Sequence, residues 1–347
     1  MNTPKIRFKG FTDDWEQRKL GDSCKLNGRI GFRGYTEKDI VTKEIGGVLT
    51  FSPTNIVDNK LTMECKNTYI TREKYDESPE IKIFNGDILF VKTGSTLGKS
   101  ALVTGLKEDA SINPQIVVMR VEKDKETFMS NVLITDGIKK QVTAVKIGGA
   151  VPTMTETELK NIKYYEPVEK EEQKRIGQYF EHLDHLITLH QRKCDETKQL
   201  KKFMLQKMFP KNGEKNPKIR FEGFTDDWEQ RKVGEFLTES RESGHKGDIA
   251  HKMTVKLWGK GVYEKKETGS ANTQYFTRHA GQFIYSKLDF LNCAFGVVPE
   301  ELENLETTAD VPAFDCDGVN PYFMFYTAIQ PRFYEKNGMI ADVRRKV

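Results

Sequence analysis

The sequence lacks the features that mark membrane, secreted or disulfide-stabilised proteins. Its five cysteines are scattered and never spaced as Cys-x-x-Cys, which predicts reduced thiols and no cysteine metal site. No apolar run approaches the ~20 residues needed to span a bilayer. The first residues also lack an apolar signal segment. We therefore expect a cytoplasmic protein without a membrane partner.

Neither sign of charge dominates the chain. The 55 basic residues nearly balance the 51 acidic ones, so the formal net charge is only +4. An excess this small neither requires nor excludes nucleic acid, because what matters is whether basic side chains share one face. A chain of 347 residues can bury two ordinary cores, and we expect two domains.

Motifs that would place catalysis or metal binding on this chain are missing. The glycine-containing loop at 94–100 departs from the GxxxxGK[ST] spacing of a phosphate-binding loop. Three histidines, His182, His185 and His190, lie close together, but no cysteine or carboxylate set completes a metal site. We expect no catalytic residue, no metal and no cofactor on this chain.

A long stretch of sequence occurs twice. Residues 4–19 are repeated at 217–232 with a single difference, because Lys9 of the first copy corresponds to Glu222 in the second. This predicts a duplicated domain rather than a solenoid, because the period is so long. We interpret Trp15 and Trp228 as packing residues, with stacking on DNA as the alternative. Outside the repeat, the sequences of the two copies diverge. This suits two domains of one architecture that recognise two different targets.

A second organising feature is the stretch from Glu169 to Met208, where apolar residues follow one another in alternating steps of four and three. This spacing predicts a long helix with one apolar seam, typical of a helix that packs along a partner helix. About 40 residues would span about 60 Å, so we interpret it as a coiled-coil-type spacer helix. The seam residues are Ile176, Phe180, Leu183, Ile187, Met204 and Met208.

Domain boundaries follow from these features. We expect a first domain at 1–167, the spacer helix at 168–210, a polar linker at 211–216 and a second domain at 217–347. The second copy ends before a counterpart of the spacer helix appears, so we expect a second, distal spacer helix to be absent from this chain.

The predicted fold class is α+β, with two mixed α/β domains joined by the spacer helix. Apolar runs in the first domain predict strands at 81–84, 88–91 and 115–121. An amphipathic helix is predicted at 126–142.

Three groups of residues occur together in this chain. They are the repeated Pro-Lys-Ile-Arg-Phe-x-Gly-Phe-Thr-Asp-Asp-Trp-Glu-Gln-Arg-Lys stretch, the start of the helix from Glu171 to Gly177, and the helical stretches Leu183–Lys193 and Leu205–Phe209. In this combination the chain resembles the specificity (S) subunits of Type I restriction-modification systems. The resemblance covers essentially the whole chain and is strongest at the repeats and the helix.

The resemblance implies two target-recognition domains, each reading one half of a bipartite site in double-stranded DNA. It implies spacer helices that pair antiparallel and hold methyltransferase (M) subunits, with restriction and translocase (R) subunits completing the complex. S-adenosylmethionine, ATP and Mg would then belong to partner subunits, and no glycine-rich strand-to-helix motif for S-adenosylmethionine occurs here. The implied role is a non-catalytic recognition subunit.

Candidate DNA contacts are side chains whose donors suit phosphates or base edges. The loop after the strand at 88–91 combines lysines with short hydroxyl side chains, and a solvated turn is the alternative interpretation. Outside this loop, each candidate taken alone is more often an ordinary solvated surface residue. The loop candidates are Lys92, Thr93, Ser95, Thr96 and Lys99. The others are Asn113, Gln115, Lys146, Arg278, Lys287, Asn292, Arg344 and Arg345.

A second hypothesis keeps the resemblance but changes the role. The spacer helix would pair with the helix of a second S chain and rebuild a full recognition unit, so that this chain acts mainly in assembly. The apolar seam favours this hypothesis, because an exposed seam promotes association. The mass of the chain in solution distinguishes the two.

Overall fold

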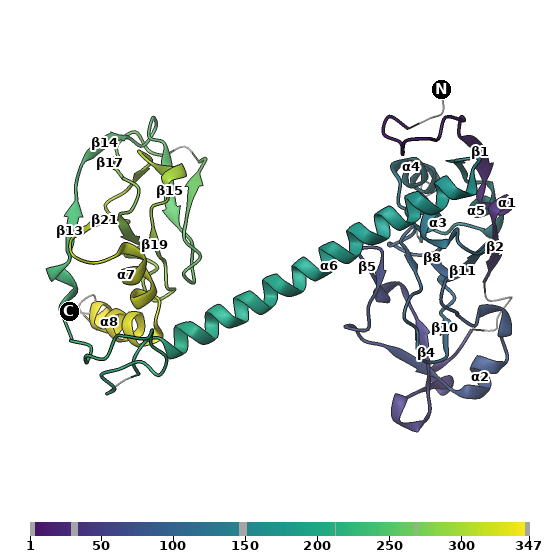
Figure 1. The fold of residues 1–347 in the computed structure, drawn as a ribbon, viewed down its shortest axis with the longest axis horizontal. Coiled ribbons are helices and arrows are strands. Elements are labelled where there is room, and N and C mark those ends of the chain that lie inside the picture. The colour runs from purple at the N-terminus through teal and green to yellow at the C-terminus, as the bar shows by residue number, and fades with distance from the viewer. Residues whose placement is uncertain (1–3, 29–33, 146–150, 212, 268, 344–347) are drawn as a thin grey trace. The chain divides into compact units, whose positions relative to one another are not determined.

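The computed structural model describes residues 4–28, 34–145, 151–211, 213–267 and 269–343. The chain divides into two compact units, unit 1 (Met1–Arg192) and unit 2 (Lys193–Val347). Each unit combines helices with β-sheets, and the long helix α6 (Lys170–Lys207) begins in unit 1 and ends in unit 2 (Figure 1). The predicted α+β class, with two sheet-rich units and a long helix, is confirmed.

The central sheet of unit 1 is antiparallel. Its two middle strands, β8 (Ile88–Val91) and β11 (Ile116–Val121), are mostly buried because runs of Ile, Leu, Val and Phe fill both faces. The strands predicted at 88–91 and 115–121 are confirmed. The strand predicted at 81–84 is wrong, because Pro79 starts a 3-10 turn at Pro79–Ile81. The strand order is β2 (Cys24–Asn27), β11 (Ile116–Val121), β8 (Ile88–Val91) and β9 (Ser100–Leu102).

A second sheet covers one face of the central sheet, and Leu89, Val91 and Ile116 lie in the shared core. A small hairpin nearby turns at Asp58 and Asn59, which both have the positive φ that a two-residue hairpin turn requires. The second sheet orders β10 (Ala110–Ile112), β4 (Val48–Phe51), β7 (Thr68–Ile70) and β3 (Ile40–Val41), and the hairpin pairs β5 (Ile56–Val57) with β6 (Lys60–Leu61).

Helices cover the other face of the central sheet. In α3 (Glu126–Leu133), Phe128 and Met129 are buried in this core. The single helix predicted at 126–142 is wrong. The chain breaks after α3, where the Thr135 hydroxyl donates to the carbonyl of Val132, and α4 (Asp136–Val145) follows. The remaining elements of unit 1 are β1 (Glu16–Lys19), α1 (Leu20–Ser23), α2 (Arg72–Asp76), α5 (Glu156–Asn161), β12 (Lys163–Glu166) and 3-10 turns at Glu37–Asp39, Lys43–Ile45 and Pro53–Asn55.

Unit 2 repeats the frame of unit 1. Its antiparallel central sheet follows the same order, with β18 (Phe283–Tyr285) in the place of β8 and β21 (Ala313–Cys316) in the place of β11. Helix α7 (Pro321–Ala328) follows β21 as α3 follows β11, and its Phe325 lies in the same hydrophobic core as Phe283 and Phe295. The strand order is β13 (Leu237–Ser240), β21 (Ala313–Cys316), β18 (Phe283–Tyr285) and β19 (Phe295–Val297).

The second sheet of unit 2 differs from that of unit 1 in strand number and order. The divergence in sequence between the two units therefore coincides with a difference in their second sheets. The order is β14 (Ser243–Lys246), β17 (Gln274–Thr277), β20 (Glu306–Thr307), β15 (Lys252–Val255) and β16 (Val262–Lys265). Helix α8 (Pro331–Val343) and 3-10 turns at Val233–Glu235 and Glu300–Leu302 complete the unit.

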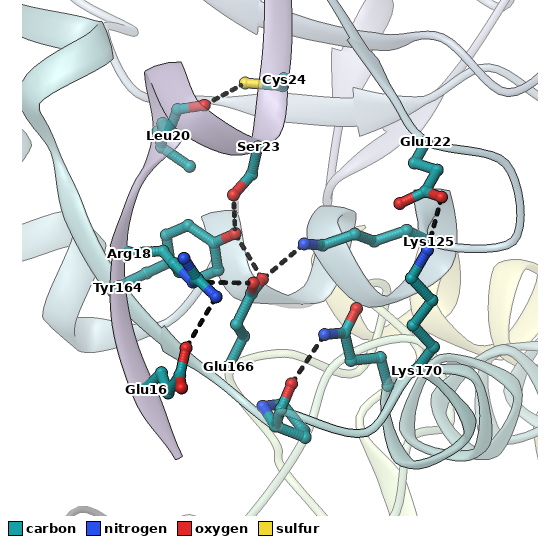
Figure 2. A network of polar contacts seen from close by, with 12 residues as sticks. Glu16, Arg18, Leu20, Ser23, Cys24, Glu122, Lys125, Tyr164, Glu166 and Lys170 are labelled. Atoms are coloured by element: carbon teal, nitrogen blue, oxygen red, sulfur yellow. Dashed lines mark hydrogen bonds and ion pairs between the residues drawn. The ribbon is translucent and has the colours of Figure 1, made fainter.

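A network of polar contacts lies beside the start of α6 in unit 1 (Figure 2). Lys170 pairs with Glu122, 2.6 Å between Nζ and Oε1. Close by, the buried Glu166 carboxylate accepts from Lys125 and lies 2.6 Å from the Tyr164 hydroxyl. Burial and the bond to this carboxylate raise the pKa of Tyr164. The Lys170–Glu122 pair is exposed and contributes little to stability, whereas the buried Glu166 carboxylate links β12 to the start of α3.

Candidate nucleic-acid interface

The loop that follows β8 is held in one shape by its backbone. Gly94 and Gly98 have φ of 106° and 93°, a region that residues with a Cβ rarely adopt. A Cβ on Gly98 would also come within 2.9 Å of Val142. Leu97 is buried and fastens the loop to the core. The polar side chains of this loop therefore sit on a rigid support.

The structure brings most of the unit 1 candidates together. The end of β8 meets the start of β11, because the two strands are antiparallel. The backbone N–H of Lys92 donates to the carbonyl of Gln115 at 2.8 Å. Ser95 and Lys99 are exposed. Lys92, Thr93, Thr96 and Gln115 are half-buried.

The two amides in this cluster have different roles. Asn113 is buried, its oxygen accepts from the backbone N–H of Gln115, and its amide nitrogen donates to Gln115 Oε1 at 3.1 Å. These bonds orient Gln115 so that its Nε2 lies beside Gly94, 3.2 Å from where a Cβ would stand. Asn113 thus positions Gln115 and leaves the amide nitrogen of Gln115 beside Gly94.

In unit 2 the loop after β18 occupies the equivalent place and carries Lys287 and Asn292. Lys287 Nζ donates to the carbonyl of Ala309 at 2.7 Å. The side-chain amide of Asn292 donates to Asp289 at 3.2 Å, and the backbone carbonyl of Asn292 accepts from the backbone N–H of Trp258. Each unit therefore has a lysine after the equivalent strand of its central sheet, Lys92 after β8 and Lys287 after β18. The residues around the two lysines differ.

Arg278 does not lie on this surface, which corrects its prediction as a DNA contact. It is 2% exposed. Its guanidinium donates to the Thr307 hydroxyl and to the carbonyls of Ser240 and Val311. Burial lowers the pKa of Arg278 to about 10. The side chain ties strands together inside unit 2, and its sequence gives no sign of this, because burial depends on distant segments.

The next residue, His279, forms a surface bridge. Its Nδ1 lies 2.7 Å from Glu303 and its Nε2 lies 2.8 Å from Glu242. The hydrogen bonds to these two carboxylates raise the pKa of His279. This bridge joins three separate segments of unit 2.

The predicted seam of α6 has three different surroundings. Ile176 packs against the core of unit 1. Phe180, Leu183 and Ile187 are exposed by 42%, 37% and 63%. Met204 and Met208 are half-buried in a groove of unit 2. The same helix exposes further large apolar side chains, namely Leu186, Leu189, Leu200 and Phe203.

Comparison with known proteins identifies the family. The pattern of the Type I restriction modification DNA specificity domain matches residues 12–199, more than half of the chain. The chain belongs to this family. Membership assigns a DNA specificity role, and no catalytic one, to this specificity-domain protein.

A relative from Methanocaldococcus jannaschii, named as a type I restriction enzyme MjaX specificity subunit, is 26% identical over 215 residues, which are 60% of this chain and 49% of the relative. The chain thus spans about half the length of that relative. A crystal structure of the Type I restriction-modification S subunit from M. genitalium shares the fold, with a TM-score of 0.52 at 12% identity, and covers 98% of this chain and 83% of that one. The HsdS subunit from Thermoanaerobacter tengcongensis has a TM-score of 0.45 at 16% identity, covering 92% and 80%.

Some candidates of this specificity-domain protein cannot be placed. Lys146, Arg344 and Arg345 lie outside the described residues. Within the described ranges, no helix has the length and apolar character needed to cross a membrane. In the same part of the chain, no group of three or more His, Cys, Asp or Glu side chains could hold a metal ion.

Sequence reasoning overlooked one further candidate surface, which lies in unit 2. The hairpin between β15 and β16 projects Trp258, which is 61% exposed and has a φ of 60°. Lys256 and Lys260 flank it and are also exposed. A tryptophan inside a Lys-x-Trp-Gly-Lys-Gly turn was a usable signal, because exposed aromatic residues beside lysines suit nucleic acid.

Proposed function

We propose that this chain is the sequence-reading component of a Type I restriction-modification complex. Unit 1 reads one half of a bipartite site in double-stranded DNA and unit 2 reads the other. The observation that carries the proposal is the shared strand order of the two central sheets, which places a lysine loop after β8 and after β18 with different residues around each lysine. One frame with two sets of donors suits two different half-sites.

The direct contacts that we propose differ in kind. Lys92 and Lys99 contact phosphates, because ammonium groups bind them without regard to sequence. Gln115 contacts a base edge, since its amide can pair with adenine in the major groove. In unit 2, Lys287 and Asn292 have the corresponding roles.

The exposed apolar face of α6 is proposed to hold M subunits. Phe180, Leu183 and Ile187 are too exposed for a helix that has no partner. R subunits complete the complex, and S-adenosylmethionine, ATP and Mg bind to partner subunits. Such a complex acts on DNA in the cytoplasm.

Lysine substitutions test the DNA-reading role. The chain is purified with its cognate M subunit, and affinity for a selected duplex is measured over a range of salt concentrations. Lys92→Ala is expected to weaken binding and to reduce the salt slope by about 1, because one phosphate contact is lost. The matched control is Lys123→Ala, an exposed lysine beyond the opposite end of β11.

Two results would refute the proposal. One is a complex that selects no sequence from a random duplex pool. The other is a salt slope that Lys92→Ala and Lys123→Ala change equally.

A second candidate function is assembly, in which α6 pairs with the helix of a second S chain to rebuild a recognition unit. The exposed apolar residues along α6 favour it, since pairing two such faces removes them from water. The mass of the purified chain in solution separates the candidates. A dimer supports pairing of two chains, and a monomer that takes up M subunit supports docking on a single helix.

A further inference from the structure

The hairpin that joins β15 to β16 in unit 2 presents a tryptophan to solvent. Trp258 lies in the turn and is 61% exposed, whereas Trp15 and Trp228 are partly buried and contact other aromatic rings. A φ of 60° puts the backbone of Trp258 in the left-handed region, which a bulky residue rarely adopts. Strain of this kind persists only where the surroundings enforce it, and it is concentrated at functional sites.

Backbone hydrogen bonds fasten this turn to the loop after β18. The N–H of Trp258 donates to the carbonyl of Asn292 at 2.9 Å, and the N–H of Gly259 donates to the carbonyl of Cys293 at 2.8 Å. A Cβ on Gly259 would lie 3.0 Å from Ile329, so the turn also lies close against the core of unit 2. The indole therefore projects from a fixed support, beside the loop that we propose to contact DNA.

The tryptophan has basic neighbours in the sequence. Lys256 and Lys260 flank it and are exposed. The sequence has no acidic residue between Asp248 and Glu264, so the turn carries charge of one sign. An exposed indole between two lysines suits nucleic acid, because bases stack on the ring and phosphates attract the ammonium groups. These features favour DNA over a protein surface as the occupant of the turn.

In unit 1 a hairpin also contacts the lysine loop, but its turn has no aromatic residue. The Nζ of Lys99 donates to the carbonyl of Ile56 at 3.4 Å, which links the β5–β6 hairpin to the loop after β8. Asp58 and Asn59 form the turn of that hairpin. We therefore expect an aromatic contact with DNA from unit 2 and not from this hairpin of unit 1.

We propose that Trp258 inserts its indole into one base-pair step of the half-site that unit 2 reads. The half-site then contains a step that is easily unstacked, TA or CA/TG, because pyrimidine–purine steps open at the lowest cost. Lys256 and Lys260 contact the phosphates beside this step. The inference rests on the proposed function, since it specifies how one of the two half-sites is read.

Selection from a random duplex pool tests the inference on the full chain in complex with its cognate M subunit. Trp258→Ala is expected to lose the preference for a pyrimidine–purine step at one position of one half-site, and to keep the preferences of the other half-site. Its affinity for the duplex that the unaltered chain selects should fall about fivefold or more, because one stacking contact is lost. Trp258→Phe keeps an aromatic ring and should retain the step preference.

The matched control is Leu288→Ala in the neighbouring loop. Leu288 is 66% exposed, so this change removes exposed apolar surface without removing an aromatic ring. It should select and bind DNA like the unaltered chain. Circular dichroism of each variant confirms that it is folded before selection.

Permanganate oxidation of the selected duplex gives a second readout, since permanganate attacks thymines that are unstacked. A thymine of the selected step should react in the complexes of the unaltered chain and of Trp258→Phe. The same thymine should be protected in the complex of Trp258→Ala, because no ring then separates the two base pairs.

Three outcomes would overturn the inference. The first is a folded Trp258→Ala chain with the positional preferences of the unaltered chain. The second is a duplex in which no thymine differs in reactivity between these two complexes. The third is a Trp258→Ala chain that takes up less M subunit while its DNA preferences stay the same, which would assign the tryptophan to a protein contact. A complex of the unaltered chain that selects no sequence at all would instead refute the proposed function, and the inference with it.

Discussion

Substituting Gly177 by Ala tests how closely α6 approaches α3. Replacing a helical glycine by alanine ordinarily stabilises a protein by about 0.5 to 1 kcal/mol. At Gly177 the new Cβ would lie 2.2 Å from Thr127 Oγ1 and 2.9 Å from the backbone nitrogen of Phe128. The backbone cannot move aside cheaply, and overpacking of this kind costs about 1 to 3 kcal/mol. We expect a net loss in the free energy of unfolding of unit 1.

The matched control is Gly137→Ala in α4, where a Cβ would meet nothing within 4 Å. We expect the two variants to differ by about 1 to 3 kcal/mol, with Gly137→Ala the more stable, since only Gly177→Ala combines helix propensity with a clash. Native-state hydrogen exchange of α3 in the full chain measures unit 1 alone and avoids assuming a single unfolding transition. Equal protection in the two variants would refute the close approach of α6 and α3.

Further predictions concern buried and titrating groups. Arg278→Met is expected to destabilise unit 2 by about 2 to 4 kcal/mol, because the carbonyl of Ser240 and the buried hydroxyl of Thr307 lose the donor that the guanidinium supplies. Hydrogen exchange of β18 and β21 measures this loss, and unchanged exchange would show that the arginine is dispensable to the fold. The pKa of His279 is raised from 6.5, so its bridge stabilises unit 2 fully below pH 6.5 and less as pH rises through the higher folded value. The urea midpoint of unfolding is measured as a function of pH. A midpoint that falls as pH rises in the unaltered chain, but not in His279→Gln, would support the bridge. A midpoint that does not change with pH in the unaltered chain would contradict it. Burial raises the pKa of Cys24 to about 12, whereas Cys194 is exposed. Alkylation near neutral pH should therefore modify Cys194 first, and equal rates, read by peptide mass mapping, would show that Cys24 is not buried.

The elements that local pattern determines were predictable. The alternation of steps along 169–208 predicts α6 because helix periodicity is a property of neighbouring residues. Runs such as Ile88–Val91 predict buried strands for the same reason. The duplication was predictable because residues 4–19 and 217–232 are nearly identical in sequence. The alignment of Lys92 with Lys287 follows from the equivalent strands β8 and β18 that precede them. A break such as that between α3 and α4 was not predictable, because periodicity continues across it.

The sequence by itself thus determined that two copies of one frame flank a long helix, and which residue types each copy carries. Only the tertiary structure decided which of those residues are available. Arg278 has the chemistry of a DNA contact but is buried by segments distant in the chain, and Asn113 orients a neighbour. Arg7 and Arg220 have the same local sequence and different partners. Burial and pairing arise from contacts between remote segments, and local pattern does not encode those contacts.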